Sequence, residues 1–350
     1  MKTEKLRAAD RLLAASLSLL LLFICAGAQA IEKQKQAGEK QKAAGPAQGA
    51  ASQKAKGPML RHEYADVNGV RLHYAASGKG KLIMFVHGFP EFWYGWKNQL
   101  AEFGKDHLAV APDMRGYNLS SKPADVEQYQ IKYLVGDLRA LADHLGYKKF
   151  TLVAHDWGGV VAWAFAMSHP DYLDRLVIIN APHPGVFQRE LRDNPAQQKA
   201  SAYMLTFRSP QAEQILSNNN YAALVQAVMG QGLKEGHFTE EDKKAYIEAW
   251  SQPGALTGGL NYYRAARIGP PTGESANAPA DVNAQMASLM VKVPTLVIWG
   301  EKDTALLTGN LDGLDKFVPN LTIKRIPDGT HWVIHEKPEL INSYIREFMK

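Results

Sequence analysis

The 350-residue sequence predicts an α/β fold: a mostly parallel sheet flanked by helices, with a helical cap domain inserted into it. Apolar segments typical of buried strands alternate with segments of helical periodicity as far as about residue 184. The alternation then stops for about a hundred residues and resumes with an apolar strand pattern near residue 293. Parallel strands need crossover connections, usually helices, and these cover both faces of the sheet.

The first predicted element is a hairpin, because Asn68-Gly69 separates two strand patterns at residues 63–67 and 70–76. Further strands are expected at residues 82–87, 108–111, 150–155, 176–180, 293–299 and 321–326, with helices near 96–103 and 133–145. Residues 185 to 288 are mostly polar-faced helix without a strong strand pattern. A helical block between sheet strands predicts a cap over the carboxyl edge of the sheet, with a pocket between the two layers.

The amino-terminal region has a different composition from the rest of the chain. Residues 1–30 combine a basic start, an apolar leucine-rich stretch and Ala28-Gln29-Ala30, the pattern of a cleaved signal peptide. Residues 31–57 hold little to bury and are expected to be a flexible Ala/Lys/Gln-rich tether. An α/β core is then predicted over 58–184 and again over 289–350, with the cap between them over 185–288. We expect export to the periplasm or medium without stable membrane insertion after cleavage; retention of the leader as an anchor is the alternative.

Charge and cysteine content narrow the possible partners. Residues 1–30 carry +2 and residues 31–57 carry +4 of the net +5, which leaves about −1 for the folded region. A nucleic-acid-binding domain would carry its positive charge on the fold, so none is predicted. The only cysteine, Cys25, lies in the predicted leader, and no Cys pair or His-Glu-x-x-His pattern is present. His331 and His335 lack a carboxylate ligand pattern, so neither a metal site nor a cofactor is expected.

Asp156 is the most informative residue of the chain. Residues 150–159 form an apolar strand, a tight turn with small residues and the start of an apolar helix, the pattern of a nucleophile elbow. A serine at this position would attack acyl carbonyls, whereas a carboxylate can displace at an sp³ carbon and form an alkyl ester. The alternative interpretation is an Asp at the end of a strand that caps the following helix.

Other residues suited to catalysis follow neighbouring strands. After the strand at 82–87, the backbone N–H of Phe89 can point at a developing oxyanion, and the N–H of Trp157 can supply a second donor. Asp303 follows the strand that begins near residue 293, and His331 lies in the loop beyond the last strand. The chain order nucleophile, acid, histidine is the order of an α/β-hydrolase triad.

These motifs together resemble a known family. His87-Gly-Phe-Pro, Asp113-Met-Arg-Gly-Tyr, His155-Asp-Trp-Gly-Gly and His331-Trp make residues from about 58 to 350 similar to α/β-hydrolases of the epoxide hydrolase and haloalkane dehalogenase branch. Ala154 and Asn118 depart from the pattern, since glycine is common at both positions. The resemblance implies hydrolysis of a small-molecule epoxide to a vicinal diol through an ester on Asp156, released by water that His331 and Asp303 activate.

Two cap tyrosines are the further predicted catalytic residues. Opening an epoxide leaves an alkoxide, and tyrosine hydroxyls are donors that stay protonated at neutral pH. Asn261-Tyr262-Tyr263-Arg264 and the stretch from Tyr203 to Pro210 resemble the epoxide hydrolase segments that supply these donors. Tyr263 and Tyr203 are therefore expected to face the nucleophile. Because the chain has 14 tyrosines, ordinary packing in an amphipathic cap is the alternative.

The predicted substrate pocket is apolar and aromatic, with Phe89, Trp157 and Trp332 as its binding residues. The alternative activity is haloalkane or haloacetate dehalogenation by the same Asp156. Many haloalkane dehalogenases present an Asn where this chain has Phe89, so a cap tryptophan such as Trp250 would have to supply the missing halide donor. A role in binding alone is a further alternative, which the intact set of three catalytic residues disfavours. Neither the particular epoxide nor the oligomeric state is predicted.

Overall fold

The computed structural model describes residues 59–272 and 289–350, and these contain an eight-stranded sheet in the order β1-β2-β4-β3-β5-β6-β7-β8. Only the β1–β2 and β2–β4 pairs are antiparallel, which confirms the predicted α/β class with a mostly parallel sheet. The strands are β1 Arg61–Val67, β2 Val70–Ser77, β3 Leu82–Val86, β4 Leu108–Pro112, β5 Phe150–His155, β6 Leu173–Ile179, β7 Thr295–Gly300 and β8 Leu321–Ile326.

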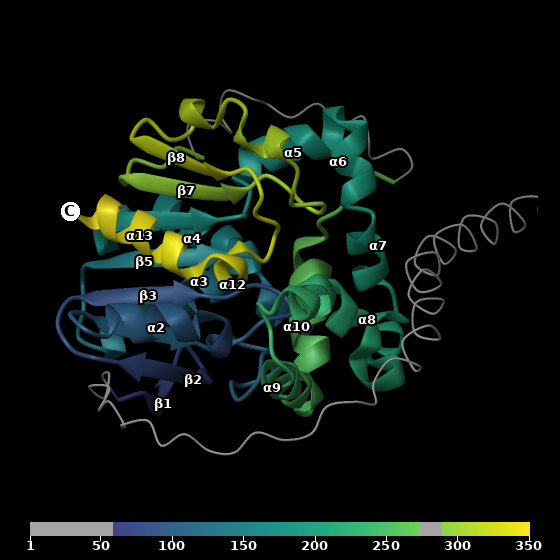
Figure 1. Cartoon of the computed structure of the whole chain (residues 1–350), viewed down its shortest axis with the longest axis horizontal. Helices are drawn as coiled ribbons and strands as arrows, with labels where there is room; N and C mark the ends of the chain where they lie inside the picture. The colour runs from purple at the N-terminus through teal and green to yellow at the C-terminus, as the bar shows by residue number, and fades with distance from the viewer. Residues whose placement is uncertain (1–58, 273–288) are drawn as a thin grey trace, which may run out of the picture. The chain divides into compact units, whose positions relative to one another are not determined.

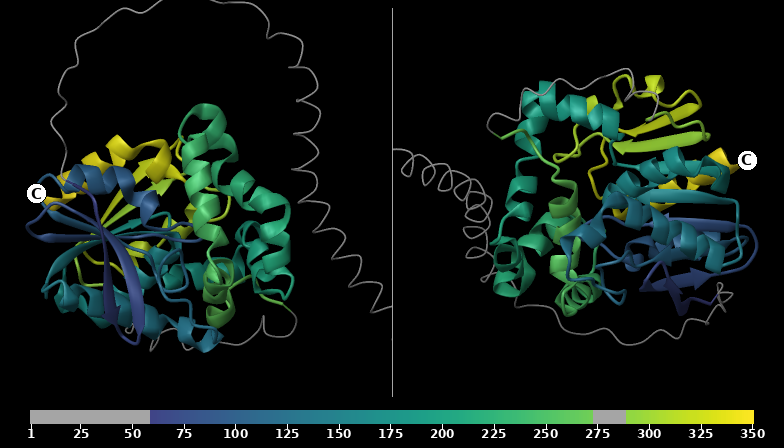
Figure 2. Two further views of the ribbon diagram at one scale, coloured as in Figure 1. Left: turned by 90° about the horizontal axis from the view of Figure 1, so that it is seen from below. Right: turned by 180° about the vertical axis from the view of Figure 1, so that it is seen from behind.

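Helices cover both faces of this sheet, as Figure 2 shows. On one face lie α2 (Lys97–Phe103), α12 (Val333–Glu336) and α13 (Pro338–Met349), and on the other lie α3 (Ile131–His144) and α4 (Asp156–Ser168). Since both faces are covered, strands β3, β5 and β7 are buried along their whole length and are almost entirely apolar. Helix α3 buries one stripe through Leu134, Leu138 and Leu141, the spacing of an amphipathic surface helix.

Strand β6 begins earlier than predicted. The expected strand covered residues 176–180, but Leu173 already pairs with Phe150 of β5. The polar residues Asp174 and Arg175 conceal the start of this strand from a search for apolar runs, since they lie at its more exposed end. The hairpin is longer than expected by two residues at its start and one at its end.

Between β6 and β7 the described residues form the cap, which consists of helices. Figure 1 shows these helices at the side where the parallel strands end. They are α5 (Pro184–Asp193), α6 (Pro195–Ala200), α7 (Tyr203–Arg208), α8 (Ala212–Glu235), α9 (Glu240–Ser251) and α10 (Ala255–Ala266). Side-chain hydrogen bonds tie the cap to the core: the Tyr262 hydroxyl donates to the Arg115 carbonyl at 2.9 Å, and the Trp250 indole donates to the Pro90 carbonyl at 2.6 Å.

Some predictions concern residues that the structure does not describe. The leader, its cleavage site and the tether at residues 1–57 lie outside the described residues, as does the predicted end of the cap at 273–288. Within residues 59–272 and 289–350, no helix is both long enough and apolar enough to span a bilayer. The same ranges hold no group of three or more His, Cys, Asp or Glu residues arranged to bind a metal ion.

Candidate active site

The candidate site lies where the order of strands in the sheet reverses direction. From β3 the chain first adds β4 on one side and later adds β5 on the other. The loops that follow β3 and β5 therefore leave neighbouring strands at one edge, the usual place of a ligand site in an open α/β sheet. These loops carry Phe89 and Asp156, and the Phe89 N–H donates to Asp156 Oδ1 at 2.7 Å.

Asp156 lies in a strained turn between β5 and α4. Its φ is 48°, in the left-handed region that a non-glycine residue adopts only at a cost of about 1–3 kcal/mol. Three glycines make room for the turn. A Cβ on Gly88 would lie 2.3 Å from Asp156 Cβ, one on Gly158 would lie 2.3 Å from the Val86 carbonyl oxygen, and one on Gly159 would lie 2.2 Å from Ala181 Cβ.

His331 faces Asp156 from the loop after β8. Its Nε2 is 3.5 Å from Asp156 Oδ2, and its Nδ1–H donates to Asp303 Oδ2 at 2.7 Å. Asp303 also accepts hydrogen bonds from the Ala305 and Leu306 N–H groups at 2.8 and 2.9 Å, and from Asn180 Nδ2 at 2.8 Å. The carboxylate is thus held in place, and it directs the other ring nitrogen of His331 toward Asp156.

The electrostatics of this group favour an ionised Asp156. Burial alone would raise the pKa of Asp156, but the hydrogen bond and positive charge of His331 outweigh burial and lower it. Burial would likewise lower the pKa of His331, yet the charges and hydrogen bonds of Asp303 and Asp156 raise it well above its usual value. These shifts favour a carboxylate at Asp156 beside an imidazolium at His331.

A small cavity opens above Asp156 and is lined by residues of both the core and the cap. Trp157, Tyr203 and Tyr263 line it together with Asp156. The remaining lining is apolar and consists of Val160, Pro182, Phe187, Met204, Ile268 and Leu306. The site therefore suits a small, largely apolar substrate.

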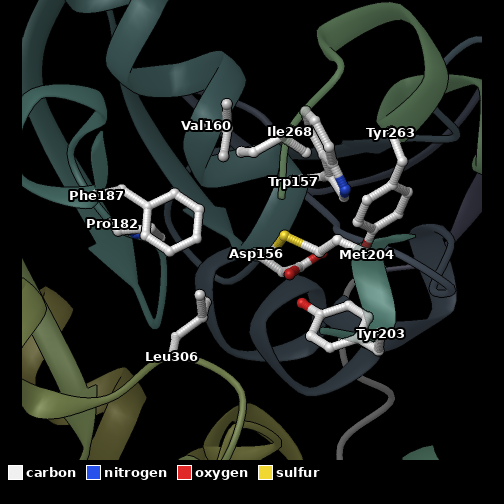
Figure 3. A pocket seen from close by; sticks show the side chains of 10 residues that line it. All are labelled: Asp156, Trp157, Val160, Pro182, Phe187, Tyr203, Met204, Tyr263, Ile268 and Leu306. Carbon is white, nitrogen blue, oxygen red and sulfur yellow. The ribbon is translucent and has the colours of Figure 1, made fainter. Parts of the chain in front are cut away.

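The two predicted cap tyrosines meet at this cavity although they come from different helices. Tyr203 is the first residue of α7 and Tyr263 lies in α10, and Figure 3 shows both hydroxyls directed toward the Asp156 carboxylate. Burial raises the pKa of Tyr203 well above 10, and the charge of Asp156 adds to the rise. Burial, Tyr203 and Asp156 do the same to the pKa of Tyr263. Both phenols stay protonated and can donate hydrogen bonds.

The structure places both predicted oxyanion donors beside Asp156, but only one of the three predicted binding side chains lines the cavity. Phe89 N–H already contacts Asp156, and Trp157 N–H belongs to the first turn of α4, whose amides have no partner within the helix. The Trp157 ring lines the cavity. The Phe89 ring does not line it and packs against Tyr263, with the ring centroids 5.5 Å apart. Trp332 does not line the cavity either: it packs edge-on against His331 at 4.9 Å and donates its indole N–H to the Ala227 carbonyl at 3.0 Å.

A buried carboxylate beside the site was not predicted. Glu91 Oε2 lies 3.1 Å from His155 Nδ1, and His155 Nε2 lies 2.9 Å from the backbone carbonyl of His331. Glu91 Oε1 accepts a hydrogen bond from the Tyr246 hydroxyl of the cap at 2.8 Å and lies 2.6 Å from His335 Nε2. Burial would raise the pKa of Glu91, but the two histidines lower it well below its usual value. Glu91 follows the Phe89 motif in the sequence, and His155 directly precedes Asp156. Their positions next to predicted site residues are the signal that could have indicated both.

A second unpredicted residue holds the loop that carries His331. Glu336 accepts hydrogen bonds from the N–H of Thr330 at 2.9 Å and from the Thr330 hydroxyl. The Thr330 hydroxyl oxygen in turn accepts the N–H of Trp332 at 3.1 Å. Glu336 therefore holds Thr330, and the Thr330 hydroxyl holds Trp332, so both sequence neighbours of His331 are fixed.

Comparisons with known proteins identify the family of the chain. Residues 81–338 match the family described as alpha/beta hydrolase fold. The chain is 39% identical to the AB hydrolase superfamily protein YfhM of Bacillus subtilis, over 83% of this chain and 98% of that protein. It is 38% identical to Epoxide hydrolase 4 of Mus musculus, over 81% of this chain and 77% of that protein. The solved structure of Bacillus megaterium epoxide hydrolase in complex with an inhibitor has a TM-score of 0.76 and 39% identity, over 82% of this chain and 99% of that one.

The chain therefore belongs to the α/β-hydrolase fold family. Its similarity to proteins named epoxide hydrolase places it in the epoxide hydrolase branch of that family, and it is a hydrolase.

Proposed function

We propose that the protein hydrolyses epoxides to vicinal diols in two steps, through an alkyl ester on Asp156. The observation that carries the proposal is the set of groups around one ionised carboxylate. His331 lies 3.5 Å from Asp156 on one side, and two tyrosine hydroxyls are directed toward Asp156 across the cavity. A carboxylate attacks sp³ carbons, and the tyrosines supply the acid that a departing epoxide oxygen needs.

In the first step Asp156 Oδ2 attacks a carbon of the epoxide. Oδ1 accepts the Phe89 N–H at 2.7 Å, whereas Oδ2 has only the longer 3.5 Å contact with His331 Nε2 and is the less firmly held oxygen. A new carbon–oxygen bond forms to Oδ2, while the bond from that carbon to the ring oxygen breaks. Tyr203 and Tyr263 hydrogen-bond the ring oxygen, and one of them transfers its proton to the alkoxide as it forms.

In the second step water attacks the carbonyl carbon of the ester. Once Asp156 is esterified it is no longer an anion, so one of the two charges that raise the pKa of His331 is lost. The pKa of His331 then falls, so the imidazolium loses its proton to solvent while the tyrosinate left by the first step regains one, which leaves the net charge of the site unchanged. The neutral imidazole can then take a proton from the attacking water. The N–H groups of Phe89 and Trp157 hold the oxyanion on Oδ1 until the diol oxygen leaves with a proton from His331 and the Asp156 carboxylate is restored.

Dehalogenation with the same nucleophile is less well supported. A departing halide needs N–H donors, and the predicted replacement donor Trp250 gives its indole N–H to the Pro90 carbonyl at 2.6 Å. The cap groups directed toward Asp156 are phenols, which suit an alkoxide better than a halide. These two observations favour the epoxide.

The two steps need different residues, so they should fail separately. His331→Gln should permit one alkylation and then stall, which leaves an enzyme heavier by the mass of one substrate in intact-mass spectrometry. Asp156→Ala should show neither turnover nor adduct. Activity of His331→Gln without any adduct would indicate direct attack by water and overturn the ester mechanism. Wild-type single turnover in ¹⁸O water adds a second test, because the first diol should lack the label.

We also propose that the protein is exported and that its leader is cleaved after Ala30. The support is the basic, apolar and small-residue order of residues 1–30. Amino-terminal sequencing of protein from the native host should find Ile31 first, and a soluble chain that still begins at Met1 would contradict the proposal.

A further inference from the structure

Asn180 was not among the predicted site residues, yet its side chain contacts the catalytic acid. It directly follows β6 and is fully buried, with a φ of 41° in the left-handed region that Asn adopts more readily than most residues. Its Nδ2 donates to Asp303 Oδ2 at 2.8 Å, and its Oδ1 accepts the Gly300 N–H at 2.9 Å. The Gly300 N–H needs an acceptor and the Asp303 carboxylate needs a donor, and this fixes the orientation of the amide.

The carboxylate of Asp303 has all of its acceptor positions occupied. Oδ1 accepts the N–H groups of Ala305 and Leu306 at 2.8 and 2.9 Å. Oδ2 accepts the Nδ1–H of His331 at 2.7 Å and the amide of Asn180. A carboxylate offers about four lone-pair positions, so these four donors fill it. His331 and Asn180 therefore share one oxygen.

The same residue also holds the backbone against which the His331 loop packs. Besides accepting the Gly300 N–H, Asn180 donates Nδ2 to the Gly300 carbonyl at 3.3 Å, and its backbone N–H donates to the Ile298 carbonyl at 3.1 Å. Gly300 packs closely against the residue before His331, because a Cβ on Gly300 would lie 2.3 Å from the Thr330 carbonyl oxygen. Asn180 therefore contacts both the acid that orients His331 and the strand end beside its loop.

Two carboxylates dominate the surroundings of His331. Burial lowers the pKa of His331, but the charge of Asp303 and the hydrogen bond to Asp156 raise it well above its usual value. The other ionisable groups on the elements around it are His155, Glu91, Tyr203, Tyr263 and Glu336. In the ester Asp156 is uncharged, so Asp303 is then the carboxylate that holds the His331 proton.

The two donors on Asp303 Oδ2 compete for its negative charge. A hydrogen bond to the charged form of an acid stabilises the anion and makes it a weaker base. Because the Asn180 amide donates to the same oxygen as His331, it weakens that oxygen as a base. The imidazolium of His331 is then less strongly held and loses its proton at a lower pH.

We propose that Asn180 is a positioning residue for the second step: it holds Asp303 Oδ2 toward His331 and weakens the hold of that oxygen on the His331 proton. This inference rests on the proposed two-step hydrolysis of epoxides. In the first step a protonated His331 stands beside an ionised Asp156, so a more firmly held proton does not hinder attack. In the second step His331 must be neutral to accept a proton from water, so the amide acts there.

Two substitutions of Asn180 separate this role from packing. Asn180→Asp keeps the acceptor for the Gly300 N–H but replaces the donor beside Asp303 with a carboxyl group. That group lies within the roughly 4–6 Å of His331 over which a charge shifts a pKa by one to three units, so the pH midpoint of ester hydrolysis should rise by about one unit or more. Below the wild-type midpoint hydrolysis should then be about 10-fold slower or more. Asn180→Leu removes the donor without adding a charge, so its midpoint should rise by less.

Rapid-quench intact-mass spectrometry follows the ester across pH after a single turnover of 1,2-epoxyhexane or styrene oxide. The rise of the ester gives the alkylation rate, which should change little in both variants, and its decay gives the hydrolysis rate. Asn310→Asp is the matched control, because Asn310 is an equally buried amide that donates to Gln197 Oε1 and to the Leu307 carbonyl instead of to Asp303. It should lower the unfolding temperature and leave the midpoint of hydrolysis in place.

The failures of the two proposals are distinguishable. If the wild-type protein forms no ester and no diol with either epoxide, the proposed function itself fails. If the ester forms but Asn180→Asp hydrolyses it with the wild-type midpoint, the function stands and the role of Asn180 is overturned. An equal shift of the midpoint in Asn310→Asp overturns it as well. Asn180→Asp retains the bond to Gly300 and carries the test by itself if Asn180→Leu does not fold.

Discussion

Removal of the two tyrosine hydroxyls gives the most direct test of how the site opens an epoxide. In Tyr203→Phe and Tyr263→Phe each ring keeps its shape and its packing against Phe207, and only the hydroxyl directed toward Asp156 is lost. The effect should therefore appear in the alkylation rate and not in the stability of the fold.

The expected loss of alkylation rate depends on how many hydrogen-bond donors hold the epoxide oxygen. Loss of one oxyanion donor usually costs about 10²–10³ in rate, or about 2.7–4 kcal/mol. In either single variant the alkoxide retains one phenol, so we expect the lower value of about 10². The double variant has no acid for the alkoxide, so its loss should be at least about 10⁴.

Rapid-quench single turnover with intact-mass detection of the ester measures alkylation separately from hydrolysis. Tyr262→Phe is a control in the same helix, because its hydroxyl donates to the Arg115 carbonyl at 2.9 Å and fastens the cap to the core. That variant should lower the unfolding temperature and leave the alkylation rate almost unchanged. If Tyr203→Phe and Tyr263→Phe both alkylate at the full rate, these tyrosines are packing residues and the proposed acid role is refuted.

Further predictions concern pH, the histidine loop and the elbow. As pH falls, Asp156 should stay ionised because its pKa is lowered, whereas His331 in the ester intermediate becomes protonated and can no longer act as a base. Acid-quenched intact-mass spectra should therefore show more ester at low pH. A constant ester fraction would contradict this prediction. Glu336→Ala removes the two hydrogen bonds that Thr330 donates to Glu336. It should slow ester hydrolysis about 10-fold or more with little change in alkylation, which burst kinetics can check. Gly158→Ala should lower the free energy of unfolding by about 1–3 kcal/mol in denaturant titrations, since its Cβ would lie 2.3 Å from a backbone oxygen.

Local patterns were sufficient to predict how the catalytic groups are presented. The elbow depends on a strand, small residues and a helix that are contiguous in the chain, so residues 150–159 alone predict Asp156 as the nucleophile. Asp303 and His331 follow two other strands. The ends of parallel strands meet at one edge, and the order of the motifs was therefore enough to predict that these three side chains lie together.

The sequence by itself determined the α/β class, the elbow with Asp156 and the arrival of Asp303 and His331 at the same edge, since strand periodicity and strand ends are local properties. Only the tertiary structure decided that Trp332 and the Phe89 ring lie outside the cavity and that Trp250 fastens the cap. It also decided that Glu91 contacts β5, α9 and α12. Glu91 meets His155, Tyr246 and His335 across 64, 155 and 244 residues of chain. No local pattern encodes such partners, because they depend on how the cap helices pack on the sheet and on the rotamers that this packing allows.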